Sequence, residues 1–260
     1  MLSTNLLAYY RQIAQTLLNV VDVETTGYAP ATGRVIEISV LQATLRDGIQ
    51  QQQTHLINPE VRVPAKITQF TGISQPMVDQ APLAEAVWHQ YLPLLKVGTL
   101  TAHNLAFDYS FIRAELDQLG IAFSRPADEQ LCTVLLARQM LPDLPSRSLP
   151  HLVRHYNFPV GKSHRAEADV LACWLLVERL LTEILNEPDE VLLPRFAKQW
   201  LPLAEAAAIL KCSTKQARSR LDKAGIPARL VGRYQTPMYQ RGDVEKVFYQ
   251  ASSATQLSWL

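Results

Sequence analysis

Residues 19–27 of the chain have the sequence Asn-Val-Val-Asp-Val-Glu-Thr-Thr-Gly. This short, valine-rich run predicts a buried central strand, because β-branched side chains pack well on a pleated sheet. Side chains alternate between the two faces of a strand, so Asp22 and Glu24 lie on the same face. Two acids on one face of an interior strand are costly unless something neutralises them, and a divalent cation does so. Half-exposed strand ends also carry such acids, so the pair alone does not decide for a metal site.

The flanking segments predict an α/β fold with a mixed sheet. Residues 34–45 alternate and are rich in β-branched side chains, and residues 50–58 follow Asp47-Gly48, which is a hairpin signal. Further strands are expected at 97–102 and 130–133. Helical spacing predicts helices near residues 6–18, 83–95, 105–119, 133–140, 148–155 and 164–185, and Pro93 is expected to end the second of them early. Antiparallel strands followed by alternating strands and helices are typical of this fold class.

A second acid follows the 97–102 strand, in His103-Asn104-Leu105-Ala106-Phe107-Asp108. Asn104 is the predicted N-cap of a helix, which places Asp108 about one turn inside it. The helix dipole favours a negative charge within that first turn. An ordinary capped helix with an acid near its start is the alternative explanation.

A third segment, His164-Arg165-Ala166-Glu167-Ala168-Asp169, opens the last long helix, with Ser163 or His164 as its expected first residue. Asp169 is surrounded by small or apolar residues of this helix, namely Ala166, Ala168, Val170 and Leu171. A surface acid on a solvated face, preceded by a capping histidine, explains the same residues.

Together the three segments resemble the DEDDh exonuclease family, whose proofreading member is the epsilon subunit of bacterial DNA polymerase III. The first family motif matches residues 21–27, the second matches residues 102–108, and the third matches His164 with Asp169. Further similarities, in the family's order, lie at residues 71–73, 131–138 and 148–155. The resemblance covers roughly residues 18–182 and implies a ribonuclease H-like mixed sheet flanked by helices.

The resemblance implies a metal-dependent 3′–5′ exonuclease that hydrolyses phosphodiesters from DNA 3′ ends. In the family, two Mg²⁺ ions, which Mn²⁺ can replace, are held by the equivalents of Asp22, Glu24, Asp108 and Asp169. His164 is the implied general base, and an imidazole changes charge near neutral pH. The oxygen-only donor set suits Mg²⁺ or Mn²⁺ rather than zinc. Two such ions can neutralise both the attacking and the leaving oxygens.

The resemblance also implies residues that seat the terminal nucleotide, and it alone supplies the 3′ polarity. The implied contacts are Thr25, Thr26, Gly27, Ile73 and Asn104. Phe70 or Phe107 could stack on a base, although an aromatic residue near a helix start is more often part of the core.

Residues 187–200 contain two prolines and no clear periodicity, so they predict a linker between an exonuclease domain at 1–186 and a second domain at 201–260. Helix, turn, helix, hairpin and helix are expected after the linker. On residues 203–207, 225–227 and 231–234, this pattern resembles the winged helix-turn-helix of excisionase-like and MerR-like DNA-binding domains. The resemblance implies DNA contacts by Lys215, Arg218 and Arg233. A protein-docking or stabilising appendage is the alternative.

The formal net charge of +1 gives no global attraction for nucleic acid, so any contact must come from local patches or from metal ions. Three widely spaced cysteines, the absence of a secretory signal and the absence of a membrane-spanning stretch predict a cytoplasmic protein. The expected partners are DNA, as single strands or 3′ ends, and a polymerase or repair protein. Two rival functions stay open: a DEDDh ribonuclease that trims RNA 3′ ends, and a non-catalytic DNA-binding regulator.

Overall fold

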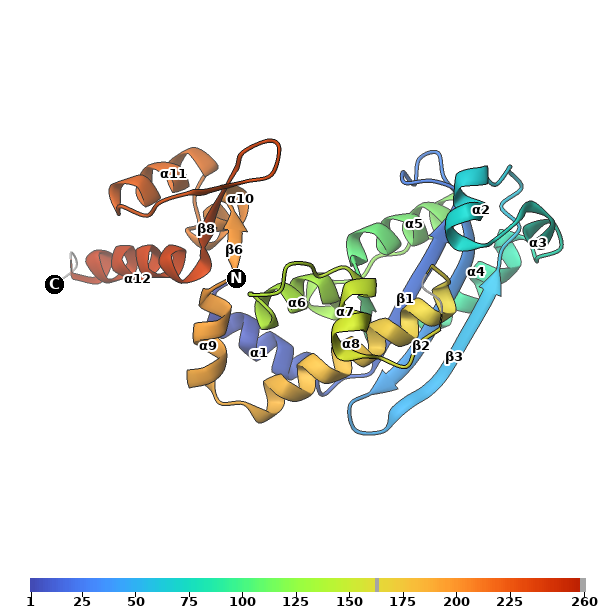
Figure 1. Cartoon of the computed structure of the whole chain (residues 1–260), viewed down its shortest axis with the longest axis horizontal. Coiled ribbons are helices and arrows are strands. Elements are labelled where there is room, and N and C mark those ends of the chain that lie inside the picture. Colours follow the sequence, from blue (N-terminus) through green and yellow to red (C-terminus); the bar gives the residue numbers. More distant parts are fainter. Residues whose placement is uncertain (162–163, 258–260) are drawn as a thin grey trace. The chain divides into compact units, whose positions relative to one another are not determined.

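The computed structural model in Figure 1 describes residues 1–161 and 164–257, with side chains up to residue 251. Ser163, one of the two residues expected to begin the last long helix, lies outside the described residues. The chain divides into two compact units. The sheet unit comprises Arg11–Ala137 and Pro145–Leu185, and the terminal unit comprises Met1–Tyr10, Arg138–Leu144 and the residues from Asn186 onward.

A mixed five-stranded sheet of order β3-β2-β1-β4-β5 forms the centre of the sheet unit, in the described part of the chain. Its strands are β1 (Leu18–Thr25), β2 (Val35–Thr44), β3 (Gly48–Leu56), β4 (Thr99–Ala102) and β5 (Gln130–Cys132). The predicted central strand is β1, which pairs antiparallel with β2 and parallel with β4. Gly48, at φ +70°, supplies the left-handed conformation that the predicted hairpin needs. The predicted α/β class with a mixed sheet is confirmed.

Helices connect the strands of the first 186 residues, and some of them cover one face of the sheet. The helices are α1 (Ser3–Ile13), α2 (Ala65–Thr71), α3 (Gln75–Asp79), α4 (Ala84–Leu95), α5 (Leu105–Gln118), the 3-10 helix η1 (Ala127–Glu129), α6 (Thr133–Met140), α7 (Leu149–Tyr156) and α8 (Ala166–Asn186). Val21 and Val23 belong to a buried cluster with side chains of α4 and α5. Because neighbouring side chains alternate, Asp22 and Glu24 face the other side of the sheet.

Pro93 does not end its helix early, because α4 continues to Leu95 with the proline inside it. Tyr91 and Leu95 are fully buried on either side of the proline. The Asn19 side chain also donates a hydrogen bond of 2.9 Å from Nδ2 to the carbonyl of Leu94. Tertiary packing of the last turn therefore outweighs the helix-breaking tendency of proline.

The terminal unit contains its own small sheet, of order β6-β8-β7 among the described residues. Its elements are α9 (Asp189–Ala197), β6 (Trp200–Pro202), α10 (Leu203–Ile209), α11 (Thr214–Lys223), β7 (Arg229–Val231), β8 (Thr236–Gln240) and α12 (Arg241–Leu257). Ser213 begins α11 with a capping box, in which it exchanges hydrogen bonds with Gln216. Within the described residues, no helix combines the length and the apolar character that a membrane crossing requires.

The range expected to be a linker is mostly helical. Helix α9 buries Leu192 and Phe196 completely, and the ring of Phe196 meets that of Tyr10 edge-on at 6.2 Å. The two prolines of the range hid the helix, because one precedes it as the N-cap and the other, Pro194, is tolerated inside it.

The N-terminal residues belong to the terminal unit, although they were expected in a domain of residues 1–186. Arg241 donates from Nη1 to the carbonyl oxygen of Met1 at 2.8 Å. Glu245 accepts hydrogen bonds from the backbone N–H and the hydroxyl of Ser3, at 2.7 and 2.8 Å. These contacts join residues more than 230 positions apart, so reading the chain in order could not predict them.

Candidate active site

Three of the four predicted acids lie together in the sheet unit. Asp22, Glu24 and Asp169 each offer a carboxylate oxygen, and these oxygens lie within 4.8 Å of one another. The first two side chains come from β1, and the third comes from the first turn of α8. All three are half-buried, so the group is open to solvent on one side.

Asp108, the fourth acid, lies in the first turn of α5 and is only 3% exposed. Its Oδ1 accepts a hydrogen bond of 3.2 Å from the backbone N–H of Val23, the residue between Asp22 and Glu24. Asp108 is not one of the three acids that share the 4.8 Å limit. Its charge is nevertheless the second cause, after burial, that raises the pKa of Asp22.

The electrostatics of the acids show excess negative charge. Burial raises the pKa of Glu24 to about 8, and Asp169, Glu37 and Asp108 add to the effect. Burial also raises the pKa of Asp108 to about 8, although the hydrogen bond from Val23 opposes it. The pKa of Asp22 is raised well above its usual range, first by burial and then by Asp108. Such a cluster cannot carry its full charge without a nearby cation.

Glu37 is part of this arrangement, and the sequence analysis did not identify it. It lies on β2 directly opposite Glu24 and is fully buried. Like charges directly opposite on neighbouring strands repel each other. Arg165 offsets the repulsion, because its Nη2 donates to Glu37 Oε1 at 2.6 Å and its Nε lies 3.2 Å from both oxygens.

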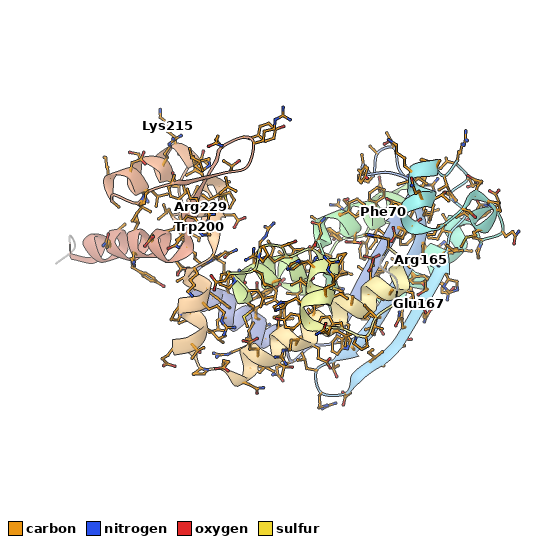
Figure 2. All side chains as sticks on the ribbon, in the orientation of Figure 1. Phe70, Arg165, Glu167, Trp200, Lys215 and Arg229 are labelled. Carbon is orange, nitrogen blue, oxygen red and sulfur yellow. The ribbon has the colours of Figure 1, made fainter. Side chains whose placement is uncertain are left out.

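The same contact fixes the start of the helix that carries Asp169. Glu37 Oε2 accepts a hydrogen bond of 2.9 Å from the backbone N–H of Ala166, the first residue of α8. Figure 2 shows Arg165 at this end of α8. The available signal in the sequence was a glutamate within the apolar run of residues 35–40.

His164 precedes α8 and does not belong to it. Its backbone is in the left-handed region, at φ 67°, which is uncommon for a residue other than glycine. Its backbone N–H donates to Asp169 Oδ2 at 3.0 Å. The imidazole lies against the ring of Phe70, with ring centroids 3.8 Å apart. The predicted general base is therefore adjacent to the predicted metal ligands.

The turn after β1 is closed by its own hydrogen bonds. Thr25 Oγ1 donates to the carbonyl of Gly27 at 2.6 Å. Thr26 exchanges two bonds with Arg34: its N–H donates to the Arg34 carbonyl, and its Oγ1 accepts from the Arg34 N–H at 2.9 Å. A Cβ added at Gly27 would meet nothing within 4 Å, so the space above this glycine is open to a ligand.

The other two predicted nucleotide contacts, Asn104 and Ile73, differ in their exposure to solvent. Asn104 is the N-cap of α5, but at φ 77° its side chain makes no capping hydrogen bond and is exposed. Ile73 is fully buried in a cluster with Ile36, Val63 and Val78. Its side chain therefore offers no contact to a nucleotide in this structure.

His103, the histidine of the second segment, has a structural role, because both of its ring nitrogens have partners within the protein. Its Nδ1 lies 2.8 Å from Thr133 Oγ1, and its Nε2 lies 2.9 Å from the carbonyl oxygen of Arg147. Burial lowers its pKa to about 4, so the ring is neutral at physiological pH. It then donates to the Arg147 carbonyl and accepts from Thr133, and it joins three separate segments of the sheet unit.

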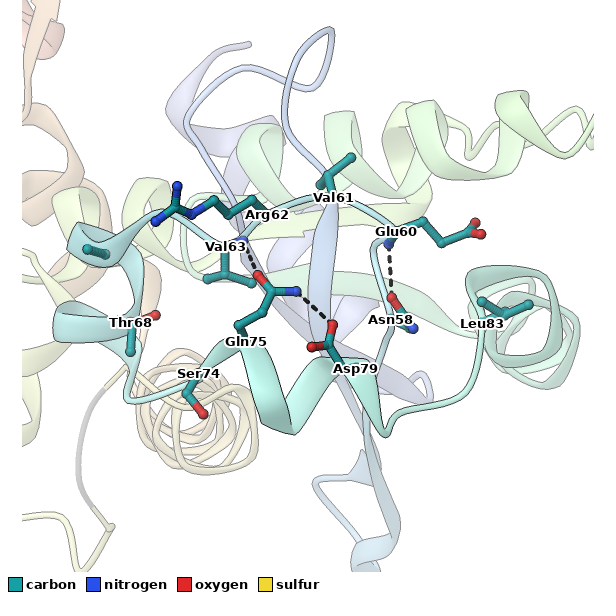
Figure 3. Close-up of a pocket in the computed structure, with 11 residues that line it drawn as sticks. Asn58, Glu60, Val61, Arg62, Val63, Thr68, Ser74, Gln75, Asp79 and Leu83 are labelled. Atoms are coloured by element: carbon teal, nitrogen blue, oxygen red, sulfur yellow. Dashed lines mark hydrogen bonds between the residues drawn. The ribbon is translucent and has the colours of Figure 1, made fainter.

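A surface hollow of about 810 Å³ lies elsewhere in the sheet unit (Figure 3). It is bordered by residues 58–63, α2 and α3. Gln75 lines the hollow. Its side chain accepts a hydrogen bond from the Val63 N–H at 2.7 Å and donates one to Asp79 at 2.8 Å. None of the four predicted acids lines this hollow. The predicted catalytic acids therefore lie on the central strand β1 and on helices α5 and α8, and not in this hollow.

Comparison with known proteins gives two similar relatives. The chain is 34% identical over 170 residues to the 3′-5′ exonuclease DinG of Bacillus subtilis, covering 65% of this chain and 18% of that protein. It is also 34% identical over 171 residues to the PolC-type DNA polymerase III of Clostridium perfringens, covering 65% of this chain and 12% of that protein. The chain thus spans only a small part of the length of either relative.

Solved structures share the fold at lower identity. Exonuclease I of E. coli in complex with a dT13 oligonucleotide has a TM-score of 0.58 at 19% identity, covering 65% of this chain and 41% of that chain. The nuclease domain of 3′hExo, a DEDDh family member bound to rAMP, has a TM-score of 0.56 at 16% identity, covering 64% and 92%. The mixed sheet flanked by helices is therefore the fold of these nucleases, as the predicted ribonuclease H-like class implies.

The family model RNase_T, described as Exonuclease, matches residues 20–177. This range begins within β1 and ends within α8, so it includes all four predicted acids and His164. Since the match covers more than half of the chain, the protein belongs to this exonuclease family.

Proposed function

We propose that the protein is a divalent-metal-dependent 3′–5′ exonuclease that hydrolyses phosphodiester bonds at the 3′ ends of DNA. The observation that carries the proposal is the group of Asp22, Glu24 and Asp169, whose carboxylate oxygens lie within 4.8 Å of one another. The similar B. subtilis protein is named a 3′-5′ exonuclease, which supports the polarity.

The four acids fit a site for two Mg²⁺ ions, which Mn²⁺ can replace. Carboxylate oxygens are the ligands that these hard cations prefer. The raised pKa values of Glu24 and Asp108, each about 8, are those of acids whose charge a cation would balance. Asp22 lies next to both Glu24 and Asp108 in this charge network, so we assign it to both ions. Bound ions would stabilise the charge that develops on the phosphate and on the leaving oxygen.

The remaining roles fall to residues around the acids. His164 would take the proton from the attacking water, a role that its place beside Asp169 supports. The open side of Gly27 and the exposed Asn104 would admit the terminal nucleotide. Thr25 and Thr26 would hold that turn in place through their hydrogen bonds.

A ribonuclease that trims RNA 3′ ends is the second candidate. The same acids can cleave either backbone, and the similarly folded 3′hExo nuclease domain binds rAMP. DNA is favoured because the two relatives at 34% identity are a 3′-5′ exonuclease and a DNA polymerase. A non-catalytic DNA-binding regulator is disfavoured, because the complete set of acids would have no function in it. A polymerase or a repair protein is the proposed partner, and the polymerase relative supports the first of these.

We also propose that the terminal unit contains a winged helix-turn-helix module that binds DNA. Helices α10 and α11, the β7–β8 hairpin and α12 follow in the order that such a module requires. Lys215 and Arg218 are exposed on α11, and Figure 2 shows Lys215 projecting outward. Arg233 is exposed between β7 and β8. Docking of a protein on this surface is the alternative.

Some of the basic residues of this unit are already used within it. Arg241 is 5% exposed and donates to Gln199 Oε1 at 2.8 Å. Arg220 donates to the carbonyl of Leu210 at 3.3 Å, and the guanidinium of Arg229 lies 5.3 Å from the ring centroid of Trp200. These three arginines are therefore not among the side chains that we propose to contact phosphates.

The direct test uses 5′-labelled single-stranded DNA, duplex DNA with a 3′ mismatch, and RNA, each with Mg²⁺ or with EDTA. We expect the label to remain on products that shorten stepwise from the 3′ end with Mg²⁺, and no cleavage with EDTA. Faster loss of RNA than of DNA would favour the ribonuclease. Release of the label as a mononucleotide while the rest of the strand is still long would contradict the 3′–5′ polarity.

A further inference from the structure

Phe70 lies at the end of α2 and remains largely exposed, at 56% of its surface. Its neighbour Thr71 is buried, and Gly72 ends the helix in the left-handed conformation. The backbone around Phe70 is therefore fixed, while its ring lies outside the core. The ring nevertheless makes one specific contact with a side chain of another segment.

That contact is the imidazole of His164. The two ring centroids are 3.8 Å apart, and the planes are inclined by 33°. Figure 2 shows Phe70 on α2, in the same unit as Arg165 at the start of α8. The stack joins two segments that are 94 positions apart in the sequence.

The stack is the main restraint on the His164 ring. The backbone of His164 is anchored through its N–H to Asp169. Its ring nitrogens, in contrast, accept or donate no hydrogen bond to a side chain among the described residues. Backbone anchoring leaves the side-chain torsions free, so the face of Phe70 selects the ring orientation.

We propose that Phe70 is a positioning residue that acts through His164: its ring holds the imidazole in the orientation that accepts the proton of the attacking water. This inference rests on the proposed role of His164 as general base. It differs from a role in which Phe70 stacks on a nucleobase, because the partner of Phe70 is then a protein side chain and not the substrate. Loss of an aromatic stack corresponds to roughly a 3- to 10-fold change in rate.

Three variants separate ring shape from simple bulk. Phe70→Leu keeps an apolar side chain but removes the flat ring, whereas Phe70→Tyr keeps the ring. Leu83→Ala is the matched control, because Leu83 is also an exposed apolar residue of the sheet unit, at 52%. At saturating DNA and Mg²⁺, Phe70→Leu should slow single-turnover cleavage roughly 3- to 10-fold with unchanged KM. Phe70→Tyr should restore the rate, and Leu83→Ala should cleave like the parent.

Two further comparisons decide between the imidazole and a base as the partner of Phe70. In a His164→Ala background, Phe70→Leu should cause no additional loss, since the residue through which it acts is gone. On DNA with an abasic 3′-terminal nucleotide, the defect of Phe70→Leu should persist. A defect that disappears on abasic DNA, or that is equally large without His164, would overturn the inference in favour of base stacking. If the single variant His164→Ala cleaves DNA normally, His164 is not the general base. That result concerns His164 alone, so it can be told apart from a failure of the role proposed for Phe70.

The stack of Phe70 and His164 can also be detected by NMR, without any cleavage reaction. In the metal-free protein, the ring current of Phe70 should shift the carbon-bound imidazole protons of His164 upfield. The His164 signals are assigned by their absence in His164→Ala, and Phe70→Leu should move them downfield while the signals of the other five histidines stay in place. Unchanged His164 signals in Phe70→Leu would show that the rings do not stack in solution, and the inference would be wrong.

Discussion

The buried Glu37 and the partly exposed Arg165 form an ion pair, in which the guanidinium meets both carboxylate oxygens at 2.6 to 3.2 Å. The pair joins β2 to the residue immediately before α8. On one side it offsets the repulsion between Glu37 and Glu24, which lie opposite each other on neighbouring strands. On the other side it fixes the helix turn that carries Asp169.

Arg165→Ala should destabilise the protein by about 2 kcal/mol, because it leaves Glu37 buried and unpaired. Loss of one partner of a fully buried pair costs more, but the Arg165 side chain is 39% exposed, so water offsets part of the loss. Urea unfolding measures the change. The control is Arg46→Ala, whose pair with Asp47 is exposed on both sides and should contribute nothing measurable. Equal stability of Arg165→Ala and Arg46→Ala would contradict the assigned role.

Asp108→Asn should raise the melting temperature of the metal-free protein at pH 8. Burial raises the pKa of Asp108 to about 8, so the folded state binds its proton more tightly than the unfolded state does. Such a group lowers stability progressively as the pH rises from about 4 toward 8. The amide oxygen of asparagine can still accept the hydrogen bond from Val23. Scanning calorimetry in EDTA checks this, and a lower melting temperature at pH 8 would oppose it.

Metal binding should release protons and should weaken as the pH falls below 8. Glu24 and Asp108 both have pKa values of about 8 without a cation, so a cation must displace protons from them at neutral pH. Titration calorimetry with Mn²⁺, in buffers of different ionisation enthalpy, counts the protons. A heat that is independent of the buffer would mean that these acids do not bind the ion.

Charge reversal at Lys215 and Arg218 should weaken binding of duplex DNA and should flatten its dependence on salt, because fewer phosphates are neutralised. Turnover at saturating substrate should stay the same, since these residues are in the other unit from the acids. Lys246→Glu is the control, because that lysine is exposed but already paired with Asp243 at 3.0 Å. Binding curves of the double variant that superimpose on the parent curves would favour a protein-docking role.

The alternation of side chains in a strand was enough to predict that Asp22 and Glu24 share a face. The fold class could also be predicted, because the hairpin at Gly48 and the later alternation of strands and helices are local patterns. The partner of Glu37 could not be predicted, since it depends on the register between β1 and β2 and on the position of the start of α8.

The division of the chain into two units could not be predicted from the sequence either. The expected domain bounds imply that a chain ending near Asn186 folds and keeps its turnover. The structure makes this truncation a poor test, because it removes Phe196, whose ring meets that of the buried Tyr10, and most of the unit to which residues 1–10 belong. Long-range packing of this kind leaves no periodic signal, and point variants on α11 are therefore preferable.

The central claim is that the acids hold the ions that drive phosphodiester hydrolysis, and Asp22→Asn tests it most directly. The variant keeps the size and shape of the side chain and removes the charge that the other acids surround. Single-turnover cleavage of 5′-labelled single-stranded DNA should slow by at least ~100-fold at saturating Mg²⁺. The melting temperature in EDTA should be equal or higher, which shows that the fold is intact. Undiminished Mg²⁺-dependent cleavage by folded Asp22→Asn protein would contradict the account.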